Sequence, residues 1–491
     1  MKSCKKLLWA IGLLLGAFVL NPNVAFAAEK GAEQNIGSTL PLAFCIPFAG
    51  LLLCIAVCPL VIERWWDKNK QYAVILWSLA FVIPFIFYAG AHEAFSEVLE
   101  TVFGDYITFI VLLFGLFCVA GNICLEGDLV GKPKLNVLLL LIGTLLSSWI
   151  GTTGASMVMI RPLIRANKWR HRKVQIVVFF IFLVSNIGGC LTPVGDPPLL
   201  MGFTRGVDFF WSMHLLPVML LNVVLLLTLF FILDTRAYKK DLADGAAPDQ
   251  SEDKKPLKLS GAHNIIFLVM IVGAVVLSGV LPKTVPFFSR SIHIFGAAKL
   301  EFSAIFEVII ILLAAIGSYK TTKNEVREAN NFTWGAIQEV AILFIGIFIT
   351  MIPALLILKA QGASLGIEKP WQFFWITGAL SSFLDNTPTY LVFFTTAASL
   401  GFHEGIKTVV GYIPEIILMA ISCGAVFMGA ITYIGNAPNF MVRSIAEENG
   451  IEMDLLSNNI MSSLSKLKIL NHNNILYGKT QLLSNLFSIE R

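Results

Sequence analysis

Long apolar runs separated by short polar segments fill most of the chain. The runs cover residues 41–61, 72–91, 102–123, 135–160, 174–203, 209–234, 264–281, 303–318, 336–359, 372–400 and 408–442. An α-helix needs about 20 apolar residues to cross a bilayer, and most of these runs approach or exceed that length. None alternates between apolar and polar positions with the period of two that marks a barrel strand. The pattern therefore predicts an all-α polytopic membrane protein.

The composition agrees with this fold class and excludes most others. Of the 491 residues, 56% are hydrophobic and only 14% are charged, whereas soluble domains are about 25% charged. An ordinary soluble enzyme, a disordered chain and a disulfide-stapled secreted domain are therefore excluded. The net charge of +4 is small and comes without a basic tail. We expect the lipid bilayer and small ions as partners, and no nucleic acid.

The N-terminus carries the pattern of a secretory signal peptide. Residues 1–27 have a basic start, an apolar middle over 7–20 and a small-residue cleavage site at Ala25-Phe26-Ala27. An uncleaved first helix is the alternative. In both cases the chain after residue 27 begins outside the cytoplasm.

The distribution of Lys and Arg predicts a re-entrant hairpin. Loops rich in these residues lie on the cytoplasmic side, and the most basic stretch of the chain covers 161–173. If 135–160 crossed the membrane once, this stretch would lie on the wrong side. A hairpin over 135–160 that enters and leaves on the cytoplasmic side removes the conflict, and Gly151-Thr152-Thr153-Gly154 is its predicted tip. The run 372–400, broken at 385–388, predicts a second hairpin that enters from outside.

The two hairpins belong to an internal repeat. Residues 147–153 align without gaps with 381–387, and 189–198 align with 429–438. The second pair lies inside apolar runs, where Gly, Pro, Asp and Asn cannot sustain a lipid-facing helix and therefore predict a break. We divide the chain into a first repeat over 28–234, a cytoplasmic linker over 235–262 and a second repeat over 263–453. Inverted repeats with broken helices are typical of secondary transporters that work by alternating access.

Two carboxylates fall at the break points of opposite halves. Asp196 and Asp385 are costly to bury as free charges, and a buried carboxylate can hold either a proton or a cation. Hard cations prefer oxygen ligands. The same breaks supply further oxygens from Ser148, Thr152, Thr153, Thr192, Ser382, Asn386, Thr387, Thr432 and Asn436, with Asn186 nearby. Helix caps are the alternative roles for the two carboxylates, and a structural role is the alternative for Asn186.

These motifs resemble those of the ion transporter superfamily over about residues 41–450. That superfamily includes arsenite permeases, citrate and dicarboxylate carriers and NhaD-type sodium/proton antiporters. The resemblance is carried by Ser185-Asn186-Ile187-Gly188-Gly189, by Gly195-Asp196-Pro197-Pro198, and by Asp385-Asn386-Thr387-Pro388, which is similar to the Asp-Asn-x-Pro tip of the NhaD-type antiporters. The first tip, Gly-Thr-Thr, departs from the Ser-Asn-Thr of dicarboxylate carriers. The resemblance implies an elevator-like carrier and a homodimer.

A Na⁺/H⁺ antiporter of the cell inner (plasma) membrane is the function that these observations predict. Its only ions would be the transported Na⁺ and H⁺, held by Asp385 and Asp196, with no cofactor. The alternative is a cation-coupled citrate or dicarboxylate carrier, and an arsenite permease is a weaker one. Against an anion carrier, the breaks contain no Lys or Arg. Metalloprotease and nucleophile-elbow motifs are absent from the sequence, so we do not expect an enzyme.

The C-terminal segment departs from the repeat. Symmetry with 209–234 requires a crossing near 455–480, but residues 454–491 form a polar tail without a run of about 18 apolar residues. One hypothesis is a frameshifted or truncated gene product.

Overall fold

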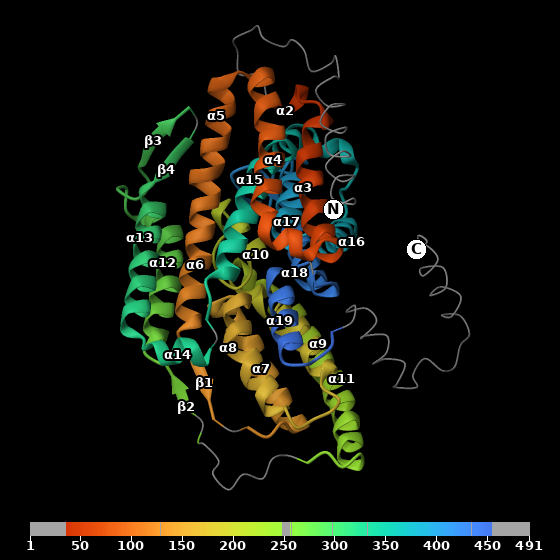
Figure 1. Cartoon of the computed structure of the whole chain (residues 1–491). Coiled ribbons are helices and arrows are strands. Elements are labelled where there is room, and N and C mark those ends of the chain that lie inside the picture. Colours follow the sequence, from red (N-terminus) through yellow and green to blue (C-terminus); the bar gives the residue numbers. More distant parts are fainter. Residues whose placement is uncertain are drawn as a thin grey trace, which may run out of the picture.

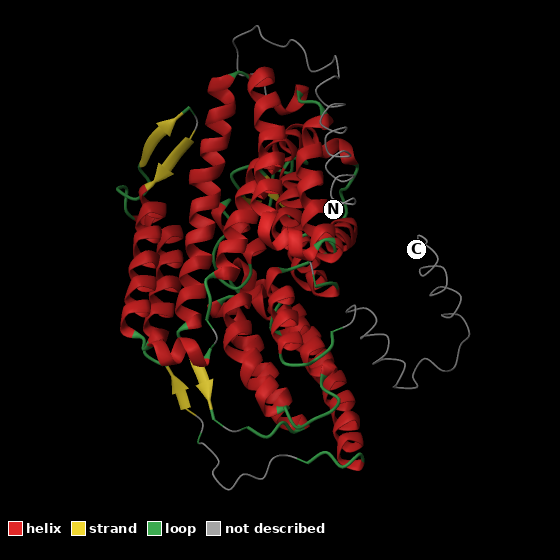
Figure 2. Cartoon of the chain, in the orientation of Figure 1, coloured by secondary structure: helices red, strands yellow, loops and turns green. Residues whose placement is uncertain are grey.

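The computed structural model describes residues 36–453, apart from 128, 248–255, 257, 297, 331 and 434. The predicted signal peptide and the polar tail over 454–491 lie outside the described residues. The described part of the chain is mostly helical, with a few short strands (Figure 2). Its helices include nine stretches that are long and apolar enough to cross a membrane. The prediction of an all-α polytopic membrane protein is confirmed.

Most of the apolar runs form full-length helices. These are α3 (Ile46–Val61), α4 (Glu63–Ala89), α6 (Ile107–Gly121), α11 (Leu216–Ala243), α12 (Asn264–Thr284), α13 (Phe302–Thr321) and α15 (Gly335–Gln361). Large apolar side chains remain exposed along them, among them Leu221 on α11 and Val269 on α12. Exposure on this scale is expected where lipid, rather than water, surrounds a helix.

The polar segment between the apolar runs 72–91 and 102–123 would be an outer loop, because it contains no Lys or Arg, but it is helical in the structure. Gly90, with a φ of 88°, separates α4 from α5 (Ala91–Glu100). A π-helical turn, η3 (Thr101–Tyr106), then joins α5 to α6 without a break. The segment 91–100 contains no proline or glycine, so nothing in it stops a helix, and the polar residues that suggested a loop form one face of α5. Single π-helical turns inside α-helices often mark functional positions.

The two segments predicted as hairpins each form a pair of packed helices. The first consists of α7 (Pro133–Ile150) and α8 (Thr152–Ala166), and the second of α16 (Pro370–Ser381) and α17 (Asn386–Ala398). The first pair lies in the lower part of Figure 1 and the second in the upper part. At the first tip Gly151 has a φ of 77°, a left-handed conformation that a residue with a Cβ rarely adopts.

Each hairpin is followed by a helix that breaks where the sequence predicted. In the first half, α9 (Val174–Leu183) gives way to the 3₁₀ turn η4 (Ile187–Leu191) and then to α10 (Pro197–Thr204). In the second half, α18 (Glu415–Met428) gives way to η7 (Gly429–Ile431) and then to α19 (Ala437–Glu448). A proline stands at the first or second position of both α10 and α19, where its missing N–H costs nothing.

Short elements connect these helices. The remaining helical segments are α2 (Ile36–Thr39), η2 (Leu42–Cys45), η5 (Trp211–Leu215), α14 (Asn324–Ala329) and η6 (Gly362–Leu365). The antiparallel strand pairs are β1 (Cys124–Glu126) with β2 (Lys258–Ser260), β3 (Ser291–Phe295) with β4 (Ala298–Glu301), and β5 (Ile406–Lys407) with β6 (Tyr412–Ile413).

The segment predicted as a linker contributes to the fold at both ends. Its first residues continue α11 to Ala243, and its last ones include β2, which pairs with β1.

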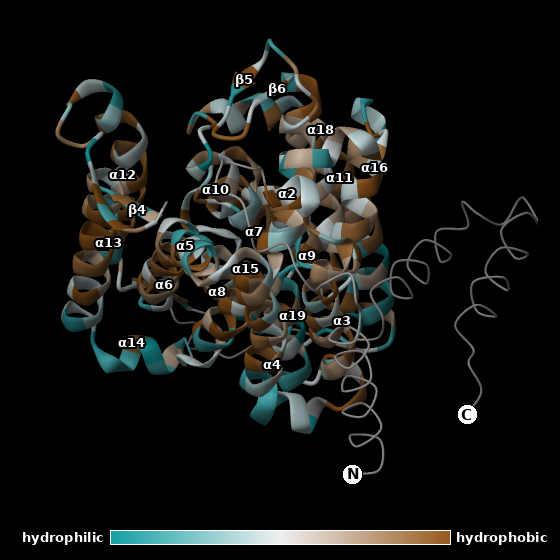
Figure 3. Cartoon of the chain, turned by 90° about the horizontal axis from the view of Figure 1, so that it is seen from above, coloured by the Kyte–Doolittle hydropathy of each residue, from teal (hydrophilic) through white to brown (hydrophobic). Residues whose placement is uncertain are grey.

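The helices form a side bundle and a central body. Helices α6, α12 and α13 contact one another and stand along one side of the molecule (Figure 1). Apolar residues line these helices, whereas α14 beside them is hydrophilic (Figure 3). The hairpins and broken helices occupy the central body, where α10 contacts α17 and α8 contacts α19. Elements of the two halves therefore pack against each other where the helices break.

Candidate functional site

Each hairpin tip is hydrogen-bonded to the broken helix of its own half. The Thr152 amide donates to the Gly195 carbonyl over 2.9 Å, and the Asn386 amide donates to the Gly435 carbonyl over 3.2 Å. These four residues are paired in the alignment of the two halves. The first free N–H group of α8 and of α17 thus meets an unwound backbone carbonyl. Helix ends buried in a membrane need such partners.

A second contact repeats at equivalent positions. The Thr192 hydroxyl donates to the Ser148 carbonyl, and the Thr432 hydroxyl donates to the Ser382 carbonyl. These residues are again paired in the alignment. The sequence repeat therefore corresponds to a repeat of three-dimensional contacts.

Glycines allow the unwound segments to fold tightly. A Cβ on Gly195 would lie 2.2 Å from the Gly189 carbonyl oxygen, and a Cβ on Gly435 would lie 2.5 Å from the Gly429 carbonyl oxygen. Both distances are shorter than a Cβ can tolerate against backbone. Equivalent glycine pairs therefore make the same close backbone contact in each half.

Asp196 lies where the two halves meet. Its carboxylate, which is 0% exposed, accepts hydrogen bonds from Thr152 Oγ1 at 3.3 Å, from Asn386 Nδ2 at 2.9 Å and from Asn436 Nδ2 at 3.3 Å. One donor comes from each hairpin tip and one from the opposite break. Although Asp196 directly precedes α10, its side chain forms no cap with that helix. The geometry thus favours the site over the helix cap that the sequence left open.

Asp385 is placed differently. Its side chain accepts a hydrogen bond from the Thr387 amide at 2.9 Å and caps α17. It is half-buried at the tip of the second hairpin. The alternative of a helix cap therefore describes Asp385 in this structure. A capping carboxylate keeps one oxygen available for a second partner, so the cap does not prevent Asp385 from taking part in ion binding.

Several other predicted ligands use their oxygens within the fold. Ser148 Oγ donates to the Gly188 carbonyl at 2.5 Å, and Ser382 Oγ donates to the Gly378 carbonyl at 2.8 Å. Thr387 Oγ1 is 3.5 Å from Asn386 Oδ1, while Thr153 is half-buried on the first turn of α8. The hydroxyls of Thr192 and Thr432 are bound to the carbonyls given above. These residues shape the breaks, and Thr152, Asn386 and Asn436 are the ones whose side chains reach Asp196.

A buried amide, Asn439, was not anticipated from the sequence. It is 0% exposed on the first turn of α19, and its Oδ1 accepts a hydrogen bond of 2.7 Å from Asn186 Nδ2. Asn186 Oδ1 accepts in turn from Asn436 Nδ2 at 3.2 Å. The signal was available, because Asn439 directly follows the aligned motif that ends at Pro438.

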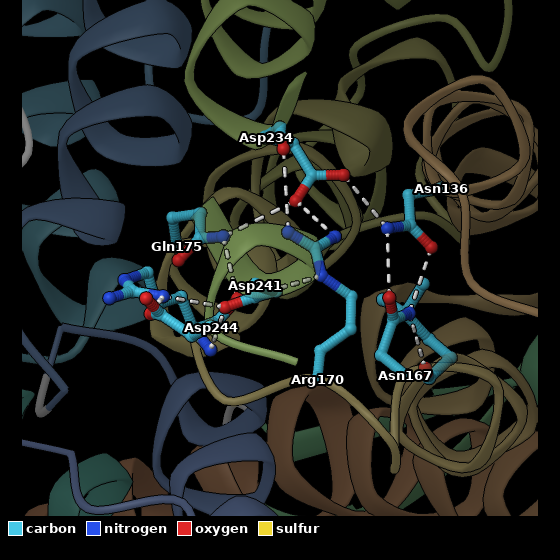
Figure 4. A network of polar contacts seen from close by, with 9 residues as sticks. Asn136, Asn167, Arg170, Gln175, Asp234, Asp241 and Asp244 are labelled. Carbon is cyan, nitrogen blue, oxygen red and sulfur yellow. Dashed lines mark hydrogen bonds and ion pairs between the residues drawn. The ribbon is translucent and has the colours of Figure 1, made fainter. Parts of the chain in front are cut away.

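The base of the first hairpin is fixed by a buried ionic network (Figure 4). Arg170, which the sequence places in a basic cytoplasmic loop, is fully buried and contacts Asp234 at 2.7 Å and Asp241 at 2.9 Å on α11. Beside it, Asn136 of α7 bonds to Asn167 and to Asp234. Burying charges is costly unless they are paired, and here the pairing ties the end of α8 to α11.

The site combines a negative group with neutral dipoles. The three donors to Asp196 are a hydroxyl and two amides, so none of them neutralises the carboxylate. A carboxylate kept out of water in this state favours a proton or a cation as a further partner. Oxygen atoms from the surrounding hydroxyls, amides and unwound carbonyls are the ligands that Na⁺ or another hard cation accepts.

Comparison of the sequence with known protein families finds a match to one family. Residues 37–471 match the family described as "Putative citrate transport". Among curated proteins no sequence matches the chain. The match covers the central body, the side bundle and both hairpins, and it agrees with a citrate/arsenite permease-like member of the ion transporter superfamily. The chain is thus a multi-pass membrane protein that belongs to this putative citrate transport family.

Proposed function

We propose that the chain is a secondary active transporter of the cell inner (plasma) membrane that exchanges cytoplasmic Na⁺ for external H⁺. The single observation that carries this proposal is the environment of Asp196. Both hairpin tips and both broken helices converge on this one carboxylate, and the donors that it receives from the described residues are all neutral. Na⁺ and H⁺ compete for it, so the site crosses the membrane loaded with one or the other. Asp385, on the tip beside Asn386, is the second ion-binding carboxylate of the proposal.

A cation-coupled citrate or dicarboxylate carrier is the second candidate, and the description of the family favours it. A polyvalent anion is recognised best by Arg and Lys side chains. The residues that reach Asp196 are neutral, and Asp385 adds a negative group at the second tip. Helix N-termini and hydroxyls at the breaks are the groups that would bind the anion in this second case.

A vesicle assay separates the two functions. Inverted membrane vesicles that contain the protein are acidified, and Na⁺, Li⁺, K⁺ or citrate is added while internal pH and uptake of labelled citrate are followed. We expect Na⁺ to release protons, and we expect no citrate uptake above that of empty vesicles. Citrate uptake that depends on the protein, with no proton release on addition of Na⁺, would replace the antiporter by the carrier. Asp196→Asn is the matched control, because it keeps the shape of the side chain and removes its charge.

A further inference from the structure

Three buried amides link the unwound segments of the two halves. Asn186 lies at the first break, and Asn436 and Asn439 flank the start of α19 after the second. All three side chains are at most 2% exposed. Buried amides need partners for two N–H donors and for one carbonyl oxygen. The partners found here determine which way each amide faces.

Asn439 is fixed by the backbone of the second break. Its Nδ2 donates to the Gly429 carbonyl at 2.9 Å and to the Thr432 carbonyl at 3.0 Å. Both acceptors are main-chain oxygens that cannot donate. The nitrogen must therefore face them, and only the amide oxygen of Asn439 is left to face Asn186.

Asn186 transmits this direction across the interface. Its Nδ2 donates to the Ile181 carbonyl at 2.8 Å and to Asn439 Oδ1 at 2.7 Å. Its own oxygen is left to accept from Asn436 Nδ2 at 3.2 Å. Asn436 consequently faces the first half with its N–H groups, which it shares among Asn186, the Ser185 carbonyl at 3.1 Å and Asp196 Oδ1 at 3.3 Å. Sharing of one N–H between two acceptors is common at helix ends.

We propose that Asn439 is a positioning residue of the ion site. Through Asn186 it holds Asn436 with an N–H group, and not the carbonyl oxygen, toward Asp196. It also connects the second break to the first, and this connection holds the Asn436 side chain within hydrogen-bonding distance of Asp196. The side-chain hydrogen bonds of Asn439 within the described part of the chain go to Asn186, Gly429 and Thr432, and not to Asp196. The inference rests on the proposed function, in which Asp196 binds the transported cation.

Its test is the binding of Na⁺ to the purified full chain. The melting temperature in detergent is titrated with NaCl at constant ionic strength, with choline chloride as the balancing salt, since a bound ion stabilises the folded state by an amount set by its dissociation constant. The variants are Asn439→Ala, Asn186→Ala and the double variant. Asn167→Ala is the matched control, because it removes one member of another buried amide pair, Asn136 and Asn167, at the base of the first hairpin.

We expect each single variant to weaken Na⁺ binding by about tenfold, the scale of one lost hydrogen bond. The double variant should bind like either single one, because both act along one path. The control should lower the melting temperature without changing the Na⁺ midpoint. If Asn439→Ala does not fold, Asn439→Ser serves, since its hydroxyl can donate to the break but lacks the amide oxygen that Asn186 requires.

The outcomes separate the inference from the proposed function. Unchanged Na⁺ affinity in Asn439→Ala, or additive losses in the double variant, would overturn the positioning role while Na⁺ binding by the unaltered chain stands. An unaltered chain that does not respond to NaCl would overturn the proposed function, and the positioning role would fall with it.

Discussion

Asn386 donates a hydrogen bond of 2.9 Å to Asp196, although 190 positions of sequence separate them. One residue belongs to the tip of the second hairpin and the other to the break of the first half. This contact brings the two repeats together at a carboxylate.

The two carboxylates should differ in their response to neutralisation. We expect Asp196→Asn to lower the rate of Na⁺-dependent proton release by roughly 100-fold or more, which is equivalent to about 2.7 kcal/mol. The reason is that the amide has no negative charge with which to hold either a proton or Na⁺. Asp385→Asn should also impair transport but should in addition weaken the start of α17, since an Asn cap replaces an Asp cap at a small cost. Vesicle assays and melting curves measure both effects. Exchange at the unaltered rate in Asp196→Asn would exclude this residue as the ion carrier.

The glycine pairs at the breaks should not tolerate a methyl group. Gly195→Ala and Gly435→Ala each place a Cβ against a backbone carbonyl, so we expect the melting temperature in detergent to fall by roughly 5 °C or more. Gly273→Ala in α12 is the control, because a Cβ there meets nothing within 4 Å. Equal melting temperatures for the three variants would contradict the close approach at the breaks.

The buried arginine should be the most sensitive part of the hairpin base. Arg170→Met leaves Asp234 buried without a cationic partner and leaves Asp241 paired with Arg172 alone, and loss of one member of such a group costs about 3–5 kcal/mol. Arg172→Ala removes a half-exposed cation and should cost about 1 kcal/mol or less. Combining Arg170→Met with Asp234→Asn and Asp241→Asn should restore most of the lost stability. Failure of the triple variant to recover would show that the arginine acts by more than charge pairing.

An ion pair connects the central body to the long helix of the side bundle. Arg205, at the end of α10, contacts Asp105 of the π-helical turn at 2.9 Å. The elevator motion implied by the family resemblance requires this contact to open. We expect a short bismaleimide bridge between Asp105→Cys and Arg205→Cys to stop transport while Na⁺ still stabilises the protein.

A bridge between Asn136→Cys and Asn167→Cys, which lie within one hairpin, serves as the control. It should leave transport active. Transport that persists with positions 105 and 205 bridged would exclude a relative movement of these two segments.

The inverted arrangement that the sequence predicts would place the two hairpin bases on opposite sides of the membrane. Lys134 and Trp371 are exposed near the starts of α7 and α16. A membrane-impermeant maleimide should label Trp371→Cys in intact cells and Lys134→Cys only in inverted vesicles. The native cysteines of the described residues are buried or half-buried, so the unaltered chain gives the background. Labelling of both positions from the same side would refute the inverted topology.

The sequence predicted the breaks and the pairing of the halves because glycine, proline and acidic residues in an apolar run have few structural alternatives. It did not predict which carboxylate caps a helix, because an Asp directly before a helix can serve either as a cap or as an ion ligand. It missed the buried position of Arg170, because a positive residue in a loop is normally solvated and its partners lie on α11, more than 60 positions away. Asn439 was missed because its partner Asn186 lies 253 positions earlier in the sequence.

The neutral surroundings of Asp196 have a consequence for energetics. If Asp196 trades one Na⁺ for one H⁺ and the charge of Asp385 does not change during the cycle, the loaded carrier bears the same total charge in both directions. The membrane voltage, worth about 2.3 kcal/mol per elementary charge per 100 mV, would then neither drive nor oppose the cycle. The proton gradient alone would set how far sodium is expelled, and collapsing the voltage with valinomycin and K⁺ would leave the rate unchanged.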